Sequence, residues 1–417
     1  MAEAVYDRDW RKKELSLREV IEKYPHISPF IIIKTDVQRR GVIFTDAALQ
    51  KVNHNIHQTV HRNFAGEKSD NTPVSLMLRD GTSVLTGGTY RGTPVKRDPF
   101  VVDVIDGKIV LSDEGEVFEE VEYWEKPEFY DKVTRSGKPM WQIAWARPQR
   151  IDINPNQFCQ FWETPGHGCK YCSIAAAYKS SDKEQFLSID DIGETVEEAL
   201  KEKGRYTSIF LTGGTILDGE ELLDKEVDYY IEILKRIGEN FGGKRFPSQL
   251  IGTAFNERQL KRLYEETGLM SYTADIEILN EEKFNWICPG KAAKIGYEEW
   301  KQRLYKAVDI FGRGYVNTGL VVGTEMAEPY GFKTEEEGIE TILTEAEELC
   351  RNGVSPVGCV WTVAPGSLFF NQKSPSLEYY VRISEGLDSL RRKYGIHVDM
   401  DNYRRCGNHP DTDLSRV

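Results

Sequence analysis

Three cysteines in the middle of the chain have the types and spacing of metal ligands. Cys159 is followed by nine residues and then by Cys169-Lys-Tyr-Cys172, in a stretch that contains Pro-Gly-His-Gly. In a reducing compartment, clustered thiols favour a metal centre or catalysis over disulfides. Two kinds of site fit this spacing. One is a zinc ion that also takes His167, and the other is an iron–sulfur cluster with one iron that has no protein thiolate.

The remaining cysteines carry weaker signals. Cys359 lies in a predicted strand, where a free cysteine is most often a small core residue, and contact with substrate is the alternative. Cys350 ends an amphipathic helical pattern and is predicted to be structural. Cys288 and Cys406 fall in predicted loops and are too few to hold a second cluster.

Three histidines follow a helical spacing near the N-terminus. On a helix over residues 46–63, His54, His57 and His61 would share one face at distances that suit a metal. No carboxylate lies within residues 51–62, however. We therefore favour a polar surface helix over a metal site.

Alternating strand and helix patterns surround the cysteine loop and must position it. Predicted strands lie near residues 149–153, 208–212, 249–253, 271–278, 315–322 and 355–363, each followed by a helix, at 188–202, 220–240, 257–266, 297–311, 334–352 and 377–393. Consecutive βα units predict a parallel sheet in a full or partial barrel, with a doubly wound open sheet as the alternative. The cysteines then lie at the carboxyl end of the first strand, where barrel enzymes carry their chemistry.

The first part of the chain has a different pattern. After predicted helices over 9–23 and 46–63, short alternating apolar runs follow, and Asp106-Gly107 marks a hairpin turn between two of them. We expect a β-rich α+β accessory domain over residues 1–145, a barrel over 146–372, and a C-terminal helix with a polar tail over 373–417. We assign substrate recognition to the accessory domain over residues 1–145.

Composition excludes several classes of protein. The 417 residues are 40% hydrophobic and 29% charged, with 54 basic and 67 acidic side chains and a net charge of −13. This acidic balance argues against broad binding to nucleic acid or to an anionic membrane. Apolar runs stay far below the ~18 residues of a membrane helix. The first ten residues, MAEAVYDRDW, lack the apolar core of a signal peptide, so we predict a cytoplasmic protein.

The cysteine loop resembles that of the radical S-adenosylmethionine (radical SAM) superfamily. The signature of this family is three cysteines that end in C-x-aromatic-C after the first strand of a partial (β/α) barrel. Tyr171 supplies the aromatic residue here. The spacing C-x9-C-x2-C departs from the common C-x3-C-x2-C, which leaves the subfamily open.

Later strand ends extend the resemblance. Gly213-Gly214-Thr215 corresponds to the Gly-Gly-Glu turn that receives the amino group of S-adenosylmethionine, with Thr215 in place of glutamate. Asp275 and Glu277 follow the fourth strand, where family members bind the ribose or the methionine carboxylate.

The last two strand ends match the adenine side of the family's site. Gly319, Val321 and Gly323 are similar to its G-x-I-x-G adenine contact. Pro365 lies in a Pro-Gly turn like the one that closes this side in several relatives.

The resemblance implies a fold and an activity. The fold is a partial (β/α)6 TIM-type barrel, and the cofactors are a [4Fe–4S] cluster on the three cysteines and S-adenosylmethionine. One-electron reduction by flavodoxin or ferredoxin would release a 5′-deoxyadenosyl radical. The barrel resembles those of biotin synthase, lipoyl synthase and the hydrogenase-maturation enzymes, which favours a small-molecule or cofactor-biosynthesis substrate. The alternatives are a radical SAM enzyme that modifies protein or RNA, and a zinc hydrolase or lyase.

Overall fold

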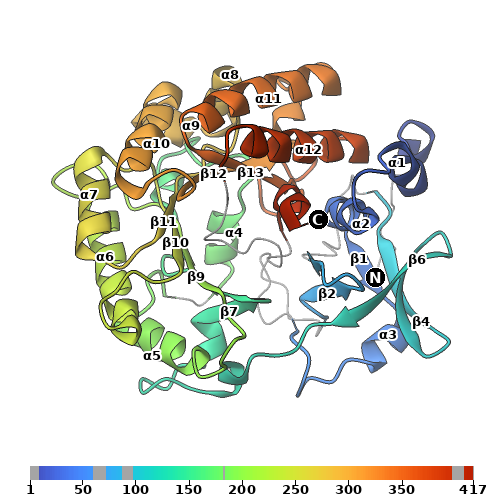
Figure 1. Cartoon of the computed structure of the whole chain (residues 1–417), viewed down its shortest axis with the longest axis horizontal. Helices are drawn as coiled ribbons and strands as arrows, with labels where there is room; N and C mark the ends of the chain where they lie inside the picture. The colour runs from blue at the N-terminus through green and yellow to red at the C-terminus, as the bar shows by residue number, and fades with distance from the viewer. Residues whose placement is uncertain (1–8, 60–71, 87–96, 182–183, 397–407, 417) are drawn as a thin grey trace.

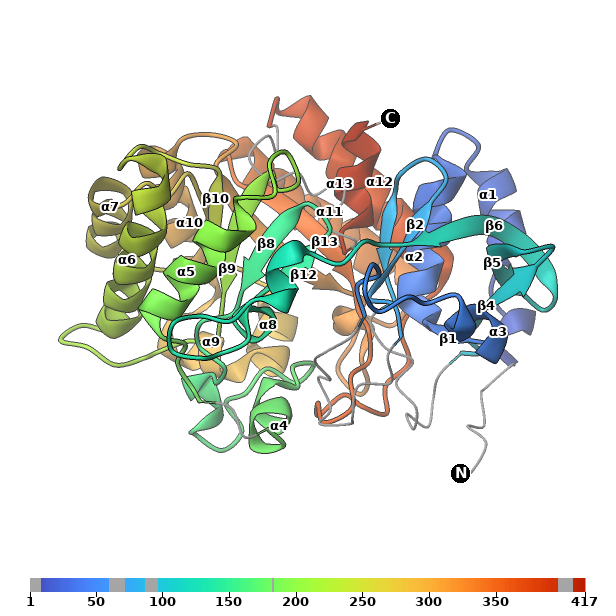
Figure 2. The same cartoon turned by 90° about the horizontal axis from the view of Figure 1, so that it is seen from below.

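Apolar alternation along the chain produces two β-sheets that lie side by side (Figure 1). The computed structural model describes residues 9–59, 72–86, 97–181, 184–396 and 408–416. Helices cover the outside of the larger sheet, while the smaller sheet packs against the N-terminal helices (Figures 1 and 2). None of the helices within the described ranges is both long and apolar enough to cross a membrane.

The smaller sheet is built from the N-terminal third of the chain. Its strand order is β1-β4-β5-β6-β2-β3, and β1 pairs in parallel with β4 while the other pairs are antiparallel. The strands are β1 (Val42–Phe44), β2 (Ser75–Leu78), β3 (Ser83–Leu85), β4 (Phe100–Ile105), β5 (Lys108–Asp113) and β6 (Glu116–Tyr123). Asp106 and Gly107 turn between β4 and β5 with φ of 51° and 81°, which confirms the predicted hairpin.

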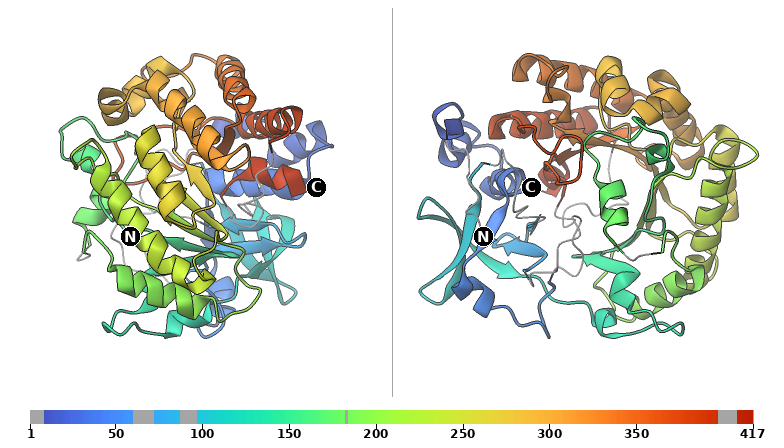
Figure 3. Two further views of the ribbon diagram at one scale, coloured as in Figure 1. Left: turned by 60° about the vertical axis from the view of Figure 1, so that its left-hand side comes forward. Right: turned by 180° about the vertical axis from the view of Figure 1, so that it is seen from behind.

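The larger sheet carries the cysteine loop. Its order is β13-β12-β11-β10-β9-β8-β7, and every neighbouring pair from β8 to β13 is parallel, whereas β7 pairs antiparallel with β8. The strands are β7 (Ala144–Arg147), β8 (Arg150–Ile153), β9 (Ser208–Thr212), β10 (Ser248–Ile251), β11 (Ser271–Thr273), β12 (Val316–Val322) and β13 (Ser355–Val360). The sheet curls into a half-barrel, as Figure 3 shows from two sides.

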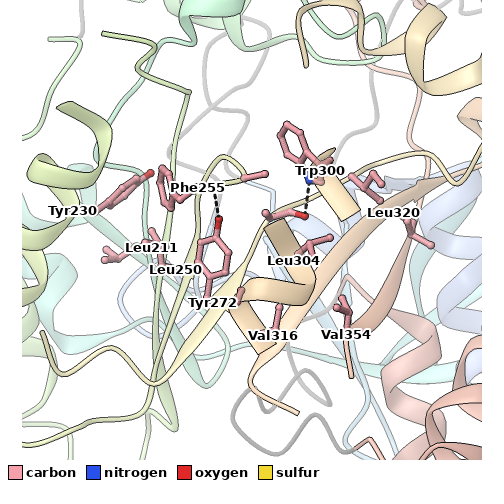
Figure 4. Packing of buried hydrophobic residues seen from close by; sticks show 14 of the residues in the cluster. Leu211, Tyr230, Leu250, Phe255, Tyr272, Trp300, Leu304, Val316, Leu320 and Val354 are labelled. Carbon is pink, nitrogen blue, oxygen red and sulfur yellow. Dashed lines mark hydrogen bonds between the residues drawn. The ribbon is translucent and has the colours of Figure 1, made fainter. Parts of the chain in front are cut away.

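Helices alternate with these strands and bury one of the two faces. They are α4 (Ile174–Lys179), α5 (Ile189–Ala199), α6 (Asp224–Gly238), α7 (Glu257–Glu266), α8 (Glu281–Ile287), α9 (Pro289–Lys294), α10 (Tyr297–Phe311), α11 (Glu335–Arg351), α12 (Leu377–Lys393) and α13 (Pro410–Asp413). In the core between helices and sheet, Phe255 N donates to the Tyr272 hydroxyl at 3.1 Å, and Trp300 Nε1 donates to Ala274 O at 3.1 Å (Figure 4). Burial of these large side chains supplies most of the stabilisation here.

The inner face of the larger sheet is polar. Side chains alternate along a strand, so residues one position away from the apolar core point to the inner side of the curl. Buried polar residues occupy these positions on all six parallel strands: Arg150, Ser208, Gln249, Ser271, Asn317 and Ser355. Sheets of this kind are normally filled by bulky apolar side chains. Here the polar side chains lie near the amino ends of the strands, where α13 packs against β13.

The two ends of the chain meet in a buried contact. Near the N-terminus lie α1 (Leu17–Lys23), α2 (Pro29–Arg40) and α3 (Asp46–Gln50). Lys34 on α2 donates to Asp413 on α13 at 2.7 Å, and both side chains are fully buried. Leu377 and Val381 on α12 join the core of the smaller sheet. The C-terminal helices α12 and α13 therefore pack against the N-terminal part of the chain.

Sequence patterns placed the helices of the larger sheet well and the N-terminal ones poorly. The predicted bounds of α7, α10 and α12 agree with the structure, but α2, α4, α8 and α9 were not predicted. The predicted helix over 9–23 is interrupted, because a 3-10 turn over Asp9–Lys12 precedes α1 and Ser16 caps α1.

The predicted helix over 46–63 is wrong. It ends at Gln50, and Asn53 N then donates to His57 Nδ1 at 3.0 Å in a turn. His54 and His57 therefore do not share a helical face, and His61 lies outside the described residues.

Replacing Asp413 by alanine is expected to destabilise the protein strongly. The change leaves the Lys34 ammonium buried without its carboxylate, which costs about 3–5 kcal/mol in comparable sites. Urea unfolding followed by circular dichroism measures the loss. The double variant Lys34→Met/Asp413→Leu is the control and should lose much less, because it removes both charges. A loss below about 1 kcal/mol for Asp413→Ala would contradict the assignment.

Candidate functional site

The cysteine loop is tied to the turn that follows β9. Gly214 N donates to Asn156 O at 3.0 Å, and Asn156 Nδ2 returns a hydrogen bond to Gly214 O at 2.7 Å. Gln160 N, just after Cys159, donates to Thr215 O at 3.0 Å. These bonds join two loops at the carboxyl ends of adjacent parallel strands, so the predicted Gly213–Thr215 turn lies directly against Cys159.

Only glycine fits at the centre of this junction. A Cβ atom on Gly214 would lie 2.0 Å from Phe158 O and 2.6 Å from Cys159 N. No heavy atoms in proteins approach so closely without a bond, and the obstruction is backbone. Gly214 is therefore required for the loop to reach its position.

The three predicted ligands interact electrostatically with one another; Cys169 is buried, and Cys159 and Cys172 are half-buried. Burial and the nearby Cys169 raise the pKa of the Cys159 thiol to about 11. Burial, then Cys169, also raises the pKa of Cys172. Ile174 N donates to Cys172 Sγ at 3.5 Å, and the Tyr171 hydroxyl donates to Cys169. Without a metal the thiols of Cys159 and Cys172 hold their protons, and a metal that binds them must displace the protons.

A fourth thiol lies at this site and was missed by the sequence analysis. Lys170 N donates to Ile287 O at 2.9 Å, and Gly290 N donates to His167 O at 2.9 Å, so the turn between α8 and α9 pairs with the cysteine loop. Between these bonds the fully buried Cys288 forms a side-chain hydrogen bond with Cys169 that lowers the pKa of Cys169. The signal was the Cys-Pro-Gly sequence at the start of a short helix.

Two carboxylates that follow β11 and one ammonium group on α9 face the cysteines. Lys291 on α9 donates to Glu277 Oε1 at 2.7 Å and to Asp275 O at 2.6 Å. Burial and the neighbouring Glu277 raise the pKa of Asp275 to about 7. Glu277 has a φ of 73°, which is rare for a residue other than glycine and is typical of functional sites. Lys291 was not predicted, because a lysine in a helix normally faces solvent.

The glycines of β12 divide into two roles. A Cβ on Gly319 would lie 2.5 Å from Asp275 Oδ1, and Gly319 N donates to that oxygen at 2.7 Å, so Gly319 is part of the site. Val321 N donates to Glu277 O at 3.0 Å. Gly323, in contrast, faces the Tyr380 hydroxyl on α12, with φ of 105°.

The two remaining predicted residues lie at the edge of the group. The Pro365-Gly366 turn packs on α4, where a Cβ on Gly366 would lie 2.7 Å from Ala176 Cβ. Phe369 N donates to Lys170 O at 3.0 Å, and this bond joins the loop after Pro365 to the cysteine loop. Cys359 on β13 is half-buried near Asp275 and Glu277, and burial first, then Glu277, raises its pKa.

The donor set suits a cluster better than a single ion. Within the ranges that the structure describes, no three His, Cys, Asp or Glu side chains converge as one metal ion requires, and this includes Cys169, Cys172 and His167. In an iron–sulfur cluster each thiolate binds its own iron, so the sulfurs stand apart. Three separate thiols, one buried and two half-buried, with hydrogen-bond donors around them meet that requirement.

Comparison with known proteins gives a family and distant relatives. The sequence model of the Radical SAM superfamily matches residues 159–330. The chain is 23% identical over 346 residues to bacteriochlorophyllide c C-7(1)-hydroxylase of Chlorobaculum limnaeum, which covers 79% of this chain and 82% of that protein.

Two solved structures with partial similarity are a radical SAM methyltransferase and a synthase. A radical SAM methyltransferase from Sphaerobacter thermophilus has a TM-score of 0.42 at 12% identity, over 95% of this chain and 98% of its own. Methylornithine synthase has a TM-score of 0.40 at 12% identity, over 64% of this chain and 79% of its own.

Gly214→Ala is expected to disrupt the site more than the fold. The added methyl group forces Phe158 and Cys159 away from the β9 turn, so iron bound after anaerobic reconstitution should fall at least about fivefold. Gly238→Ala, on α6, is the control, since its Cβ would meet Phe246 at an ordinary 3.6 Å. Iron content and far-ultraviolet circular dichroism are measured for both. Full iron loading of Gly214→Ala would show that the junction does not position Cys159.

Proposed function

We propose that this chain, which belongs to the radical SAM superfamily through residues 159–330, is a radical SAM enzyme that holds a [4Fe–4S] cluster on Cys159, Cys169 and Cys172. One observation carries the assignment of the ligands. The cysteine loop is hydrogen-bonded to the Gly213–Thr215 turn at the carboxyl ends of two adjacent parallel strands. The cluster's ligands and the predicted methionine-binding turn thus form one unit.

The bound cofactors supply the chemistry, and the protein supplies a position and a barrier to water. When bound, the cluster delivers one electron that cleaves S-adenosylmethionine to a 5′-deoxyadenosyl radical. We assign the amino group of the methionyl part to the Gly213–Thr215 turn, whose backbone can be approached closely because of its glycines. A flavodoxin or ferredoxin is the proposed electron donor.

Residues of β12 and of the segment after β11 complete the proposed binding surface. We assign Glu277 to a polar group of S-adenosylmethionine, since Lys291 fixes its carboxylate from one side. Gly319, Val321 and Gly323, with the turn at Pro365, are assigned to the adenosyl part. Of these, Gly323 has the weakest support, because it faces Tyr380 on α12.

We further propose a small-molecule or cofactor-biosynthesis substrate. The bacteriochlorophyllide hydroxylase named above is a relative along most of its length, and its name states a substrate of that class. We regard the curled sheet as the partial (β/α)6 barrel over residues 146–372, with the cysteine loop at the carboxyl end of β8. The β-rich part over residues 1–145 is the proposed recognition module, and a cytoplasmic location suits the reduced thiols.

Iron analysis tests the cluster assignment. After anaerobic reconstitution the chain should bind about four iron and four sulfide and show broad visible absorption. Cys159→Ala should lose most of both, because one of three ligands is gone. Cys350→Ala is the control, since Cys350 is fully buried on α11, away from the cysteine loop. Equal iron in the two variants would contradict the assignment, and zinc without iron would favour a hydrolase or lyase.

Release of 5′-deoxyadenosine tests the activity separately. The reconstituted chain, supplied with S-adenosylmethionine and dithionite, should form 5′-deoxyadenosine, and Glu277→Gln should lower this rate at least about tenfold by weakening a charge-assisted contact. Chromatography of the quenched reaction measures the product. A variant with normal iron and an unchanged rate and KM would remove Glu277 from the binding surface.

A further inference from the structure

Glu226 is a buried carboxyl group that none of the assignments above uses. It lies on α6, is 1% exposed, and reaches the carboxyl ends of β9 and β10. Its Oε2 accepts from Ile216 N at 2.8 Å, and its Oε1 accepts from Thr253 N at 2.9 Å. Two backbone donors on different loops therefore hold the group in a single orientation.

A chain of two hydroxyl groups leads from this carboxyl to the cluster site. Thr253 Oγ1 lies 3.0 Å from Glu226 Oε2, and Thr215 Oγ1 lies 2.8 Å from Thr253 Oγ1. The hydroxyl and the backbone N–H of Thr215 are both in hydrogen-bond contact with the sulfur of Cys159. Glu226 is thus linked to a proposed cluster ligand without touching it.

Each hydroxyl has one proton, so the chain has two arrangements. With Glu226 ionised, Thr253 donates to the carboxylate and Thr215 donates to Thr253. Cys159 then receives only the backbone N–H groups of Thr215 and Phe161. With Glu226 protonated, the carboxyl donates to Thr253, Thr253 donates to Thr215, and the Thr215 hydroxyl donates to the sulfur.

We propose that Glu226 is a positioning residue that decides, through Thr253 and Thr215, whether Cys159 receives a hydrogen bond from the Thr215 hydroxyl in addition to those from backbone N–H groups. This inference rests on the proposed function, because it matters only if Cys159 binds the cluster. Hydrogen bonds to the sulfurs are one of the means by which a protein sets the reduction potential of an iron–sulfur cluster. The reduction potential of the cluster would therefore depend on whether Glu226 carries a proton.

The surroundings allow Glu226 to change its protonation state near neutrality. Burial raises the pKa of Glu226 to about 7, against the hydrogen bonds from Thr253 and Ile216. Lys291 on α9 is the cation that faces it and acts in the opposite direction to burial. The other titratable groups that face it are the phenols of Tyr230 on α6 and Tyr272 on β11, which stay neutral because burial raises their pKa.

The sign of the coupling follows from charge. On reduction, one electron passes from an external donor to the cluster, and one proton passes from water to the carboxylate of Glu226. The protonated state directs one more donor to the sulfur and stabilises the reduced, more negative cluster. The reduction potential should therefore be high below the pKa of Glu226 and fall as the pH rises through it.

Two valine variants should fix the potential at opposite limits. Thr215→Val removes the donor, so its potential should stay at the wild-type value of high pH. Thr253→Val removes the competing acceptor, so the Thr215 hydroxyl always donates to Cys159, and the potential should stay at the wild-type value of low pH. One hydrogen bond to a charged group changes the ratio of reduced to oxidised cluster about tenfold at fixed solution potential.

The experiment is a redox titration of the reconstituted full-length protein with viologen mediators and without S-adenosylmethionine. It covers about pH 6 to about pH 8, one unit on either side of the Glu226 pKa. Thr215→Ser and Thr253→Ser should restore the pH dependence, and Thr273→Val controls for a buried threonine that instead pairs with Gln249. Iron content is matched in every sample.

Two results would overturn the inference: a wild-type potential that is constant over this range, or equal potentials for the two valine variants. Either result, with a normal cluster, leaves the proposed function standing. A wild-type chain that binds no iron overturns the proposed function and this inference together.

Discussion

The junction between the cysteine loop and the β9 turn is the constraint on which the site depends. Asn156 and Gly214 exchange hydrogen bonds across it, and the missing side chain of Gly214 lets Phe158 and Cys159 come close. Two neighbouring parallel strands bring the loops to the same edge of the sheet. Every other candidate residue is placed relative to this junction by strands that follow in order.

Burial gives the site its electrostatic character. Lys291 is held between Asp275 and Glu277, and the cysteines lie within reach of their charges. In a low-dielectric setting such charges act more strongly than at the surface, and water cannot screen them. The same cation that fixes Glu277 acts to lower the pKa of Cys169. It also opposes the rise in the pKa of Glu226 that burial causes. One lysine thus influences both the carboxylates and the thiols.

The sequence predicted what local patterns encode. Amphipathic periodicity marked the helices of the larger sheet, helped by the cap at Ser188 on α5, and the three cysteines marked the site. Residues that act through packing left weaker traces. Cys288 and Glu226 reach the site only through tertiary contacts, and the helix over 46–63 was overestimated because Asn53 and His57 form a local hydrogen bond that competes with helix. His54 and His57 accordingly lost their shared face.

The ion pair between Lys34 and Asp413 also bears on the order in which the chain folds. Most of the described chain separates Lys34 on α2 from Asp413 on α13. At about 5–20 residues per second of synthesis, the ammonium group waits roughly 20 seconds or more for its carboxylate. Burial of a charge without its partner is costly, so we expect the contact between α2 and α13 to form late in folding.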